Sequence, residues 1–567
     1  MNEIIESQPS KPTKIQLGES VWIDRWADVG SDWFSPILVK ETRQALKSRQ
    51  FFWTFFLLLA AVGTWTMIGL TVNDSRLDLG DAGPSLLSGY WVILGFPLAI
   101  VIPFGTYRSL AREYEDGTIQ LISVTTMKAW QIVSGKLGSS LLQMVIYLSV
   151  MAPCIAFTYL LRGLSIPQIA AGLLVSVVGS FGLCCIALFF ASATRSRAYG
   201  VGVSILLIVL QCVAYFGWCA FAVALSEGEI PISANEEGIL IIFGLLTVIL
   251  TTGLLMFAGA ASLISFESDN RSTLVRCMML LQQTLFVGWI ITTYCYSNHP
   301  EQTIAINFVS THYWLLMGFI LVGESPHLSS RVCRSLPGTL LGRSLFSLFM
   351  PGPGRGLIFA VTNLWLCASL FLVIQIIGYD LLPGPDSTIS NRYAIPPGRT
   401  ENYLLGNLTV CMYGTLFISL VYLFCAFLRR QGSRATSVIS FFFGIVLVAF
   451  TTGFSLLYHY NFLRPSEWRD YSIDQFFNWY WTTYEITQNG FSSITIDVFI
   501  LALVVMAGII LFALIHASRE LLIEKTAVPE KVRTEIERVR KFNKPAAGES
   551  IEEIFGTLEP TTESKNF

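Results

Sequence analysis

Long apolar runs, separated by short polar segments, are the feature that most constrains how this chain can fold. A helix needs about 20 apolar residues to cross the hydrocarbon core of a bilayer, and the chain holds twelve runs of roughly that length. The runs cover residues 51–72, 87–107, 138–161, 169–193, 199–226, 238–265, 276–297, 306–323, 357–379, 403–428, 436–458 and 491–516. The pattern predicts an all-α polytopic membrane protein with about twelve transmembrane helices.

The composition agrees with lipid as the solvent around these helices. Charged residues make up 13% of the chain and hydrophobic residues 53%, whereas soluble domains are about 25% charged. The net charge of −2 gives no indication of a nucleic-acid partner. The 11 Cys lie mostly inside apolar runs and the five His are scattered, so their spacing predicts no metal site. Residues 1–32 are polar, so no cleaved signal peptide is expected.

The distribution of Lys and Arg orients the predicted spans. If the N-terminus is cytoplasmic and the spans alternate in direction, 31 of the 37 basic residues fall in cytoplasmic segments and six fall outside. An excess of basic residues is typical of cytoplasmic loops. We therefore predict that both termini are cytoplasmic.

Two segments allow more than one interpretation. The run at 306–323 is the weakest of the twelve because it contains Asn307, His312 and Tyr313, and it is either a span or a re-entrant segment. The outer segment 459–490 contains eight aromatic residues between Trp468 and Tyr484. It is either an aromatic belt at the level of the head groups or a lid or partner surface.

These features divide the chain into five parts. The parts are a polar N-terminal segment (1–32), an interfacial amphipathic helix (33–50), a six-span region (51–265), a second six-span membrane region (266–516) and a cytoplasmic C-terminal tail (517–567). The sequence leaves open whether the second membrane region is a pseudo-repeat of the first.

Residues 33–50 are predicted to form a helix along the membrane surface. Ser35 suits the N-cap position and Pro36 suits the first helical position. On a helical wheel one arc carries Leu38, Val39, Thr42, Ala45 and Leu46, and a separate arc carries Lys40, Arg43 and Lys47. An apolar face of this kind enters the lipid, and a basic face meets anionic head groups. The simpler alternative is a basic flank before the first span.

A polar segment, residues 108–136, separates the second and third apolar runs. A first helix is predicted to end with Arg112, Glu113, Glu115 and Asp116, and Gly117 interrupts it. Thr125 or Thr126 can cap a second helix. That second helix, MKAWQIVSGKL, leads into the third span. Both glutamates are expected to face water. The segment is either an ordinary ordered loop or a structured surface that binds a partner.

The order of these parts resembles the permease subunit of a bacterial ABC transporter of the type-2, exporter-like class. Such permeases often carry E-R-x-x-G-T-L-E-x-L-L-x-T-P-L-S, followed by I-V-x-G-K, between their second and third spans. The matching residues here are Glu113, Gly117, Thr118, Ile119, Leu121, Ile122, Thr125, Ile132, Val133, Gly135 and Lys136. Gln120 and Thr126 stand where the pattern has an acidic residue and a proline. The stretch SPILVKETRQALKSR also resembles the in-plane N-terminal helix of members grouped with multi-copper enzyme maturation permeases.

The resemblance implies a transport subunit of the cell inner (plasma) membrane, an exporter driven by a separate P-loop ATPase. ATP would bind to that partner, and the permease itself would hold no cofactor. The residues implied in coupling to the ATPase are Arg112, Glu113, Glu115, Gly117, Thr118, Thr125, Thr126 and Lys136. The lipid bilayer is the other expected partner, contacted by Lys40, Arg43 and Lys47. A second permease copy is a further partner, unless the twelve spans act as a fused pair.

The chain has no phosphate-binding loop of its own. Such a loop needs G-x-x-x-x-G-K-[ST] to cradle the phosphates. The pair Gly135–Lys136 is followed by Leu137, and Trp130 stands where the first glycine belongs. We therefore expect the chain not to be an enzyme that hydrolyses ATP.

Two other functions stay open. An ion-coupled secondary carrier usually keeps charged residues within its spans, and these spans are nearly free of charge, although broken helices can bind ions through carbonyl groups alone. The other alternative is a membrane scaffold or assembly factor that transports nothing.

The orientation predicts how Asp116 reacts when it is replaced by cysteine. In a background without reactive native cysteines, Asp116→Cys should resist an impermeant maleimide in intact cells and react in inverted vesicles, because the positive-inside bias assigns the segment to the cytoplasm. Labelling from outside intact cells would contradict the whole predicted topology.

Overall fold

The computed structural model describes a chain made almost wholly of helices. The described residues are 36–72, 83–119, 127–161, 163–194, 197–230, 236–266, 269–297, 301–326, 339–381, 400–432, 436–462, 473–490 and 496–521, with isolated positions at 471 and between 327 and 338. The structure is 89% helical and has no strand among these residues. The helices form two compact units, Met1–Phe266 with Arg271–Asn298 (unit 1) and Glu267–Asn270 with His299–Phe567 (unit 2).

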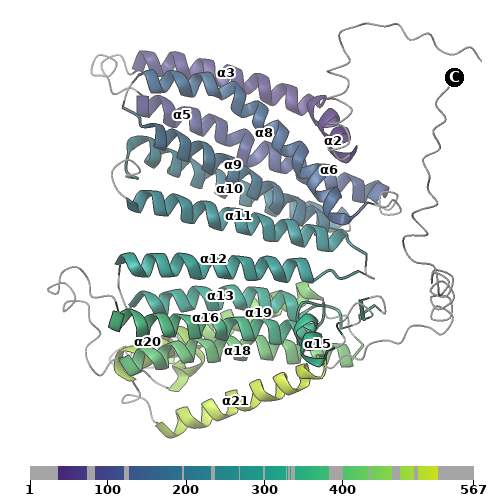
Figure 1. Cartoon of the computed structure of the whole chain (residues 1–567), viewed down its shortest axis with the longest axis vertical. Coiled ribbons are helices and arrows are strands. Elements are labelled where there is room, and N and C mark those ends of the chain that lie inside the picture. The colour runs from purple at the N-terminus through teal and green to yellow at the C-terminus, as the bar shows by residue number, and fades with distance from the viewer. Residues whose placement is uncertain are drawn as a thin grey trace, which may run out of the picture. The chain divides into compact units, whose positions relative to one another are not determined.

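The helices of unit 1 lie side by side along nearly one direction (Figure 1). They are α2 (Pro36–Leu46), α3 (Arg49–Val72), α5 (Gly83–Phe96), the π-helical turn η1 (Pro97–Val101), α6 (Ile102–Glu115), α8 (Ala129–Leu160), α9 (Ile166–Ala193), α10 (Arg197–Glu227), α11 (Glu236–Ile264) and α12 (Thr273–Ser297). The short helix α2 lies at the end of the unit where α6 ends.

Unit 2 has long helices of the same kind and three short ones. They are α13 (Glu301–Val322), α15 (Leu340–Ser347), α16 (Pro353–Leu381), α18 (Thr400–Arg430), α19 (Ser437–Phe462), the 3-10 turn η2 (Ile473–Phe477), α20 (Trp479–Asn489) and α21 (Ile496–Ser518). Within this unit α15 and α20 lie at opposite ends of the long helices (Figure 1).

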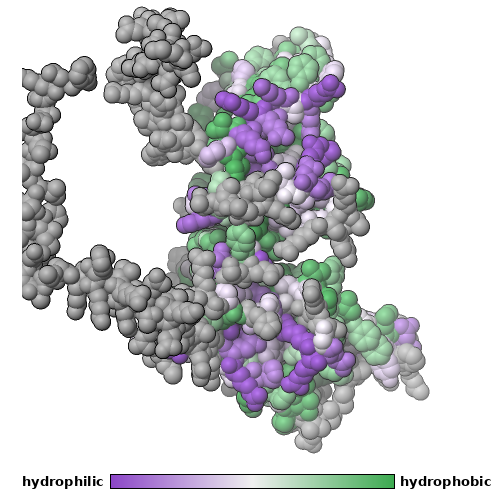
Figure 2. Space-filling view, turned by 90° about the vertical axis from the view of Figure 1, so that its right-hand side faces the viewer, coloured by the Kyte–Doolittle hydropathy of each residue, from purple (hydrophilic) through white to green (hydrophobic). Residues whose placement is uncertain are grey.

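Eleven helices in the described part of the chain are long and apolar enough to cross a membrane. The twelfth predicted span corresponds to α21, whose described apolar stretch, Ala502–Ser518, is shorter. The segment 306–323 lies in α13, which is continuous from Glu301 to Val322 and is one of the eleven. The chain is thus an all-α, multi-pass membrane protein, and the predicted fold class is confirmed. In the view of Figure 2, hydrophilic residues gather at the helix ends of each unit and apolar residues flank them.

The second span is much longer than a bilayer requires. Together α5, η1 and α6 form one apolar helix of 33 residues, Gly83–Glu115. The π-helical turn begins at Pro97, which has no N–H to donate to the α-helical ladder. At 1.5 Å per residue the helix is about 50 Å long, against about 30 Å of hydrocarbon. The polar end of α6 therefore extends beyond the apolar layer, as does that of α8, which has 32 residues.

Polar side chains attach α3 to its neighbours in unit 1. The hydroxyl of Thr54 lies 2.6 Å from that of Tyr147 on α8, and the hydroxyl of Thr66 lies 2.7 Å from that of Tyr90 on α5. The Trp65 indole also donates to the Leu86 carbonyl at 3.1 Å. In lipid, where apolar contact alone gives helices little reason to associate, such bonds hold neighbouring helices together.

Asn307 and His312, two of the polar residues of α13, are hydrogen-bonded inside unit 2. The Asn307 amide donates to the side-chain oxygen of Asn407 on α18 at 3.1 Å. The His312 ring makes a hydrogen bond to the Tyr480 hydroxyl of α20. A helix carrying these residues can therefore lie at membrane depth without exposing them to lipid.

The aromatic segment 459–490 packs onto unit 2 through its described residues, 473–490. Trp479 at the start of α20 is fully buried, and its ring contacts Phe308, His312 and Phe417. Tyr484, one turn further on, is exposed. Part of the segment is thus core of the unit rather than a belt around it.

Glycines allow α9 and α11 to approach closely. A Cβ atom at Gly182 would lie 2.9 Å from the Ile249 side chain, and one at Gly253 would lie 3.2 Å from the Gly182 Cα. Gly179, on the same helix as Gly182, has open space around the corresponding position. Small residues at such a crossing are what lets two membrane helices pack.

We expect Gly182→Leu to destabilise unit 1. Overpacking of this kind costs about 1–3 kcal/mol, and thermal unfolding of the purified protein in detergent should show a lower midpoint. Gly179→Leu is the matched control, because it adds the same side chain to the same helix in open space. Equal midpoints for the two variants would show that the α9–α11 contact does not limit stability.

Candidate functional site

The segment 108–136 contains the predicted helix break. Helix α6 ends at Glu115, the N–H of Asp116 donates to the Arg112 carbonyl at 2.8 Å, and Gly117 has a φ of 69°. This left-handed conformation costs little only for glycine. The end of the first helix and the break at Gly117 are therefore as predicted.

The second helix of the segment begins later than predicted. The N-cap of α8 is Lys128, whose N–H donates to the Gln131 side chain at 2.9 Å. The assignment of the cap to Thr125 or Thr126 was wrong, because Gln131 satisfies the start of the helix from within its own first turn. Thr125 and Thr126 themselves lie outside the described residues.

Helix α2 packs directly on the start of α8. A Cβ atom at Gly135 would lie 2.9 Å from the Ile37 side chain, and one at Gly138 would lie 2.8 Å from the Leu38 side chain. The two glycines form a flat strip one helical turn apart, on which α2 lies. Leu38 therefore faces α8, and its prediction as a lipid-facing residue was wrong, whereas Val39 is exposed.

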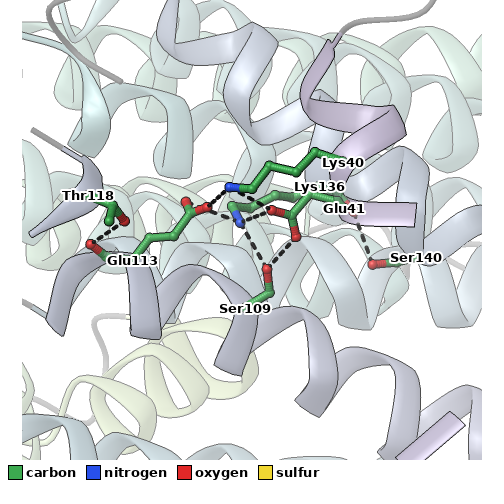
Figure 3. A network of polar contacts seen from close by, with 7 residues as sticks. All are labelled: Lys40, Glu41, Ser109, Glu113, Thr118, Lys136 and Ser140. Carbon is green, nitrogen blue, oxygen red and sulfur yellow. Dashed lines mark hydrogen bonds and ion pairs between the residues drawn. The ribbon is translucent and has the colours of Figure 1, made fainter. Parts of the chain in front are cut away.

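Lys136 is buried beneath α2, with 2% of its surface exposed. Its ammonium lies 3.1 Å from Glu41 on α2 and 3.2 Å from Glu113 on α6, and it donates to the Ser109 hydroxyl at 2.9 Å (Figure 3). An ammonium group has three donors. Two of them are used in hydrogen bonds, to Glu41 and Ser109, and the contact with Glu113 is an ion pair, so two carboxylates compensate the buried charge.

The two carboxylates are held by further contacts in the same network (Figure 3). Ser109 donates to the second oxygen of Glu41 at 2.7 Å. Lys40 lies 3.4 Å from the second oxygen of Glu113 and is 60% exposed at its side chain. We call Lys40, Glu41, Ser109, Glu113 and Lys136 the charge cluster. Its two bases and two acids cancel, and it joins α2, α6 and α8.

Two neighbouring hydroxyls extend the charge cluster along its helices. Ser140 donates to the Lys136 carbonyl at 3.2 Å and lies 2.5 Å from the Thr106 hydroxyl. Thr118 donates to the Glu113 carbonyl at 3.3 Å across the turn. The break at Gly117 is thus tied back to the end of α6.

The expectation that Glu113 faces water was wrong. Its side chain is only 12% exposed, because α2 lies over it and Lys136 pairs with it. Glu115, two residues further on, is exposed as predicted. The difference arises because a single sequence cannot indicate which helix will cover the end of another.

The remaining predicted residues lie around the charge cluster without joining it. Arg112 and Thr118 are exposed near the turn, and Arg43 and Lys47 are exposed on and just after α2. Helix α2 itself ends at Leu46, so Lys47 lies in the short turn before α3. The membrane contact proposed for Lys40, Arg43 and Lys47 stays a prediction.

Sequence reasoning missed Glu41 and Ser109. Glu41 was the available signal, since it is the one acidic residue in PILVKETRQAL and lies between the apolar and basic arcs of the helical wheel. An acid that is buried on an otherwise basic surface helix indicates a basic partner elsewhere in the fold. Ser109 carries no comparable signal.

The charge cluster is suited to holding helices together rather than to catalysis or metal binding. Its acids are occupied by ammonium and hydroxyl groups. Within the described part of the chain, no group of three or more His, Cys, Asp or Glu could hold a metal ion. A search of protein-family models, curated proteins and solved structures finds none that matches this chain.

We expect Lys136→Met to destabilise unit 1 strongly. Removing one partner of a buried ion pair leaves uncompensated charge and costs about 3–5 kcal/mol, here on Glu41 and Glu113. Chemical unfolding in mixed micelles, followed by Trp fluorescence, would measure the change. Lys40→Met is the matched control, since it removes the exposed base of the same cluster and should have little effect. Similar losses for both variants would contradict the role given to the buried ammonium.

Proposed function

We propose that the chain is the permease subunit of an ABC transporter of the type-2, exporter-like class, in the cell inner (plasma) membrane. A separate P-loop ATPase would bind ATP and dock on the segment 108–136. The motif match at Glu113, Gly117, Gly135 and Lys136 supports the class. The substrate class is not part of the proposal.

The single observation that carries this proposal is the charge cluster at the base of the segment. Two helices that extend beyond the bilayer, α6 and α8, are joined there to the surface helix α2 by a buried ion network. A push on the turn between α6 and α8 would therefore move all three helices together. An ordinary loop needs no such anchoring.

The exposed residues of the turn are suited to contact with a partner. Arg112, Glu115, Asp116 and Thr118 are exposed, while Glu113 and Lys136 are used inside the cluster. We therefore assign docking to the exposed residues and positioning to the buried ones. A partner can shift the spans only if its contacts differ between its own states, and exposed charges allow such contacts to form and break.

The charge cluster argues against the ion-coupled carrier. A residue that carries a coupling ion must gain and lose it during transport, but the charged groups of Lys136, Glu41 and Glu113 are engaged with one another and with Ser109. The cluster also lies where the polar ends of α6 and α8 begin, not midway along a span.

The proposal predicts that the chain depends on a partner for ATP turnover and that Glu115 and Asp116 contribute to binding it. The double variant Glu115→Lys, Asp116→Lys should weaken co-purification of the ATPase by about tenfold or more, because like charges replace complementary ones at the contact. ATP turnover of the complex, relative to the ATPase alone, should fall in parallel. The variant should remain folded, since both side chains are exposed.

The matched control reverses two exposed acids at the other end of unit 1. Glu227 and Glu229 lie at the end of α10 that the charge bias assigns to the outside. Their reversal to Lys should leave both co-purification and turnover unchanged. If the native chain isolates no ATPase from its host, the permease function is wrong and the scaffold becomes the better interpretation.

A further inference from the structure

Unit 2 repeats the helix order of unit 1. The helices α13, α16, α18, α19 and α21 follow one another as do the second span (α5, η1 and α6), α8, α9, α10 and α11. The short elements η2 and α20 are inserted between α19 and α21. By the alternation of spans, each helix of unit 2 also runs in the same direction across the membrane as its counterpart.

The packing of these helices is repeated as well. In unit 1 the second span packs against α8, α9 and α10, while α11 packs against α8 and α9, and α9 also packs against α8 and α10. In unit 2, α13 packs against α16, α18 and α19, while α21 packs against α16 and α18, and α18 also packs against α16 and α19. Every packed pair named here among the five helices of one unit has its counterpart among the five of the other, whereas α2, α3 and α12 of unit 1 and α20 of unit 2 pack outside this set.

The correspondence extends to charged residues at the helix ends. In unit 1 an acid ends the second span (Glu113), a buried base lies near the start of the next helix (Lys136), and a second acid comes from the N-terminal helix (Glu41). In unit 2 an acid follows α13 (Glu324), and a base that is 4% exposed lies in the first turn of α16 (Arg355).

A further acid of unit 2, Glu520, follows α21, the counterpart of α11, so it is not the equivalent of Glu41 on α2. Its carboxylate accepts from the Gly354 N–H at 2.8 Å, and the Glu324 carboxylate accepts from the Gly352 N–H at 2.9 Å. The Arg355 guanidinium donates to the carbonyl oxygens of Glu520 and Pro351. The three charged residues therefore join the ends of α13, α16 and α21.

Glycine precedes the buried base in both units. A Cβ atom at Gly354 would lie 2.8 Å from the Ala517 carbonyl oxygen, just as one at Gly135 would lie 2.9 Å from the Ile37 side chain. In unit 1 the absence of a side chain at Gly135 lets α2 approach α8 beside Lys136. In unit 2 the absence of a side chain at Gly354 lets α21 approach α16 beside Arg355.

We propose that unit 2 is a second copy of the permease architecture and that the end of α13, at Glu324 and Ser325, is a second contact for the partner ATPase. Arg355 is its positioning residue, in the place that Lys136 has in unit 1. The proposal rests on the function proposed above and adds that one chain carries both halves of the transporter. A second permease copy would then not be needed.

Site-specific photo-cross-linking in the native complex tests the contact. A benzoylphenylalanine is placed at Glu115 in unit 1, at Ser325 in unit 2 or at Tyr484 on α20, all of which are exposed. Tyr484 is the control, because it lies at the opposite end of unit 2 from Ser325. We expect cross-links to the ATPase from Glu115 and Ser325 but not from Tyr484.

The outcomes separate the two proposals. Cross-linking from Glu115 without Ser325 overturns the second contact and leaves the permease function standing. Cross-linking from neither position overturns both. Cross-linking from all three positions also overturns the second contact, since the control position Tyr484 should form no cross-link to the ATPase.

Arg355 is tested by its effect on coupling rather than on binding. Arg355→Met should leave the ATPase bound and lower ATP turnover of the complex, relative to the ATPase alone, by about fivefold or more. Arg355→Lys, which keeps the charge, should restore part of it. Arg430→Met removes an exposed base at the end of α18 and should change nothing. Unchanged turnover in a folded Arg355→Met complex overturns the positioning role. If Arg355→Met does not fold, Arg355→Lys is measured in its place: a partial loss of turnover supports the role, and unchanged turnover overturns it.

Discussion

The ion pairs of Lys136 are the contact on which the organisation of the first unit depends. A buried ammonium is tolerated only when its partners compensate for the loss of water, and here three partners from two other helices do so. None of the three helices can move away without breaking an ion pair or hydrogen bond that is buried within the unit. Helix α2 thereby becomes part of the body that α6 and α8 form. The strip of Gly135 and Gly138 makes this possible by admitting the α2 backbone.

The features that could be predicted from the sequence are those that depend on residues close together in the chain. The positions of the spans, Pro36 at the start of α2 and the break at Gly117 each depend on a few neighbouring residues and were predicted, although the second and third helices extend beyond the runs 87–107 and 138–161. Glu41 and Lys136 are 95 residues apart, and no local pattern relates them. The same limit explains the error at Glu113, whose exposure depends on a helix some 70 residues earlier in the chain. The cap at Lys128 was missed because the usual preference is for a cap side chain that accepts from the first turn, whereas here the Gln131 side chain accepts from the Lys128 N–H.

Unit 2 shows why polar residues in an apolar run are a poor reason to doubt a span. Asn307 and His312 made 306–323 the weakest of the predicted helices, yet both side chains bond to partners on α18 and α20. Bilayer hydrocarbon offers them nothing, so they must face the protein, and they fix which side of α13 does so. The buried Trp479 extends the same argument to the outer segment. Its neighbours come from two long helices, Phe308 from α13 and Phe417 from α18, so α20 belongs to the core of the unit.

The charged residues at the helix ends of the two units differ in how they join their helices. In unit 1 side-chain charges meet directly, so the link between α2, α6 and α8 depends on the charge state and reach of Lys136. In unit 2 the acids accept from glycine amides, and the arginine donates to main-chain carbonyl groups. An arginine fork can engage two carbonyl groups at once, which the point charge of a lysine does less well. Unit 2 is therefore joined at its helix ends by main-chain geometry, which resists deformation, whereas unit 1 is joined by a network whose exposed member, Lys40, can be displaced by an incoming charge.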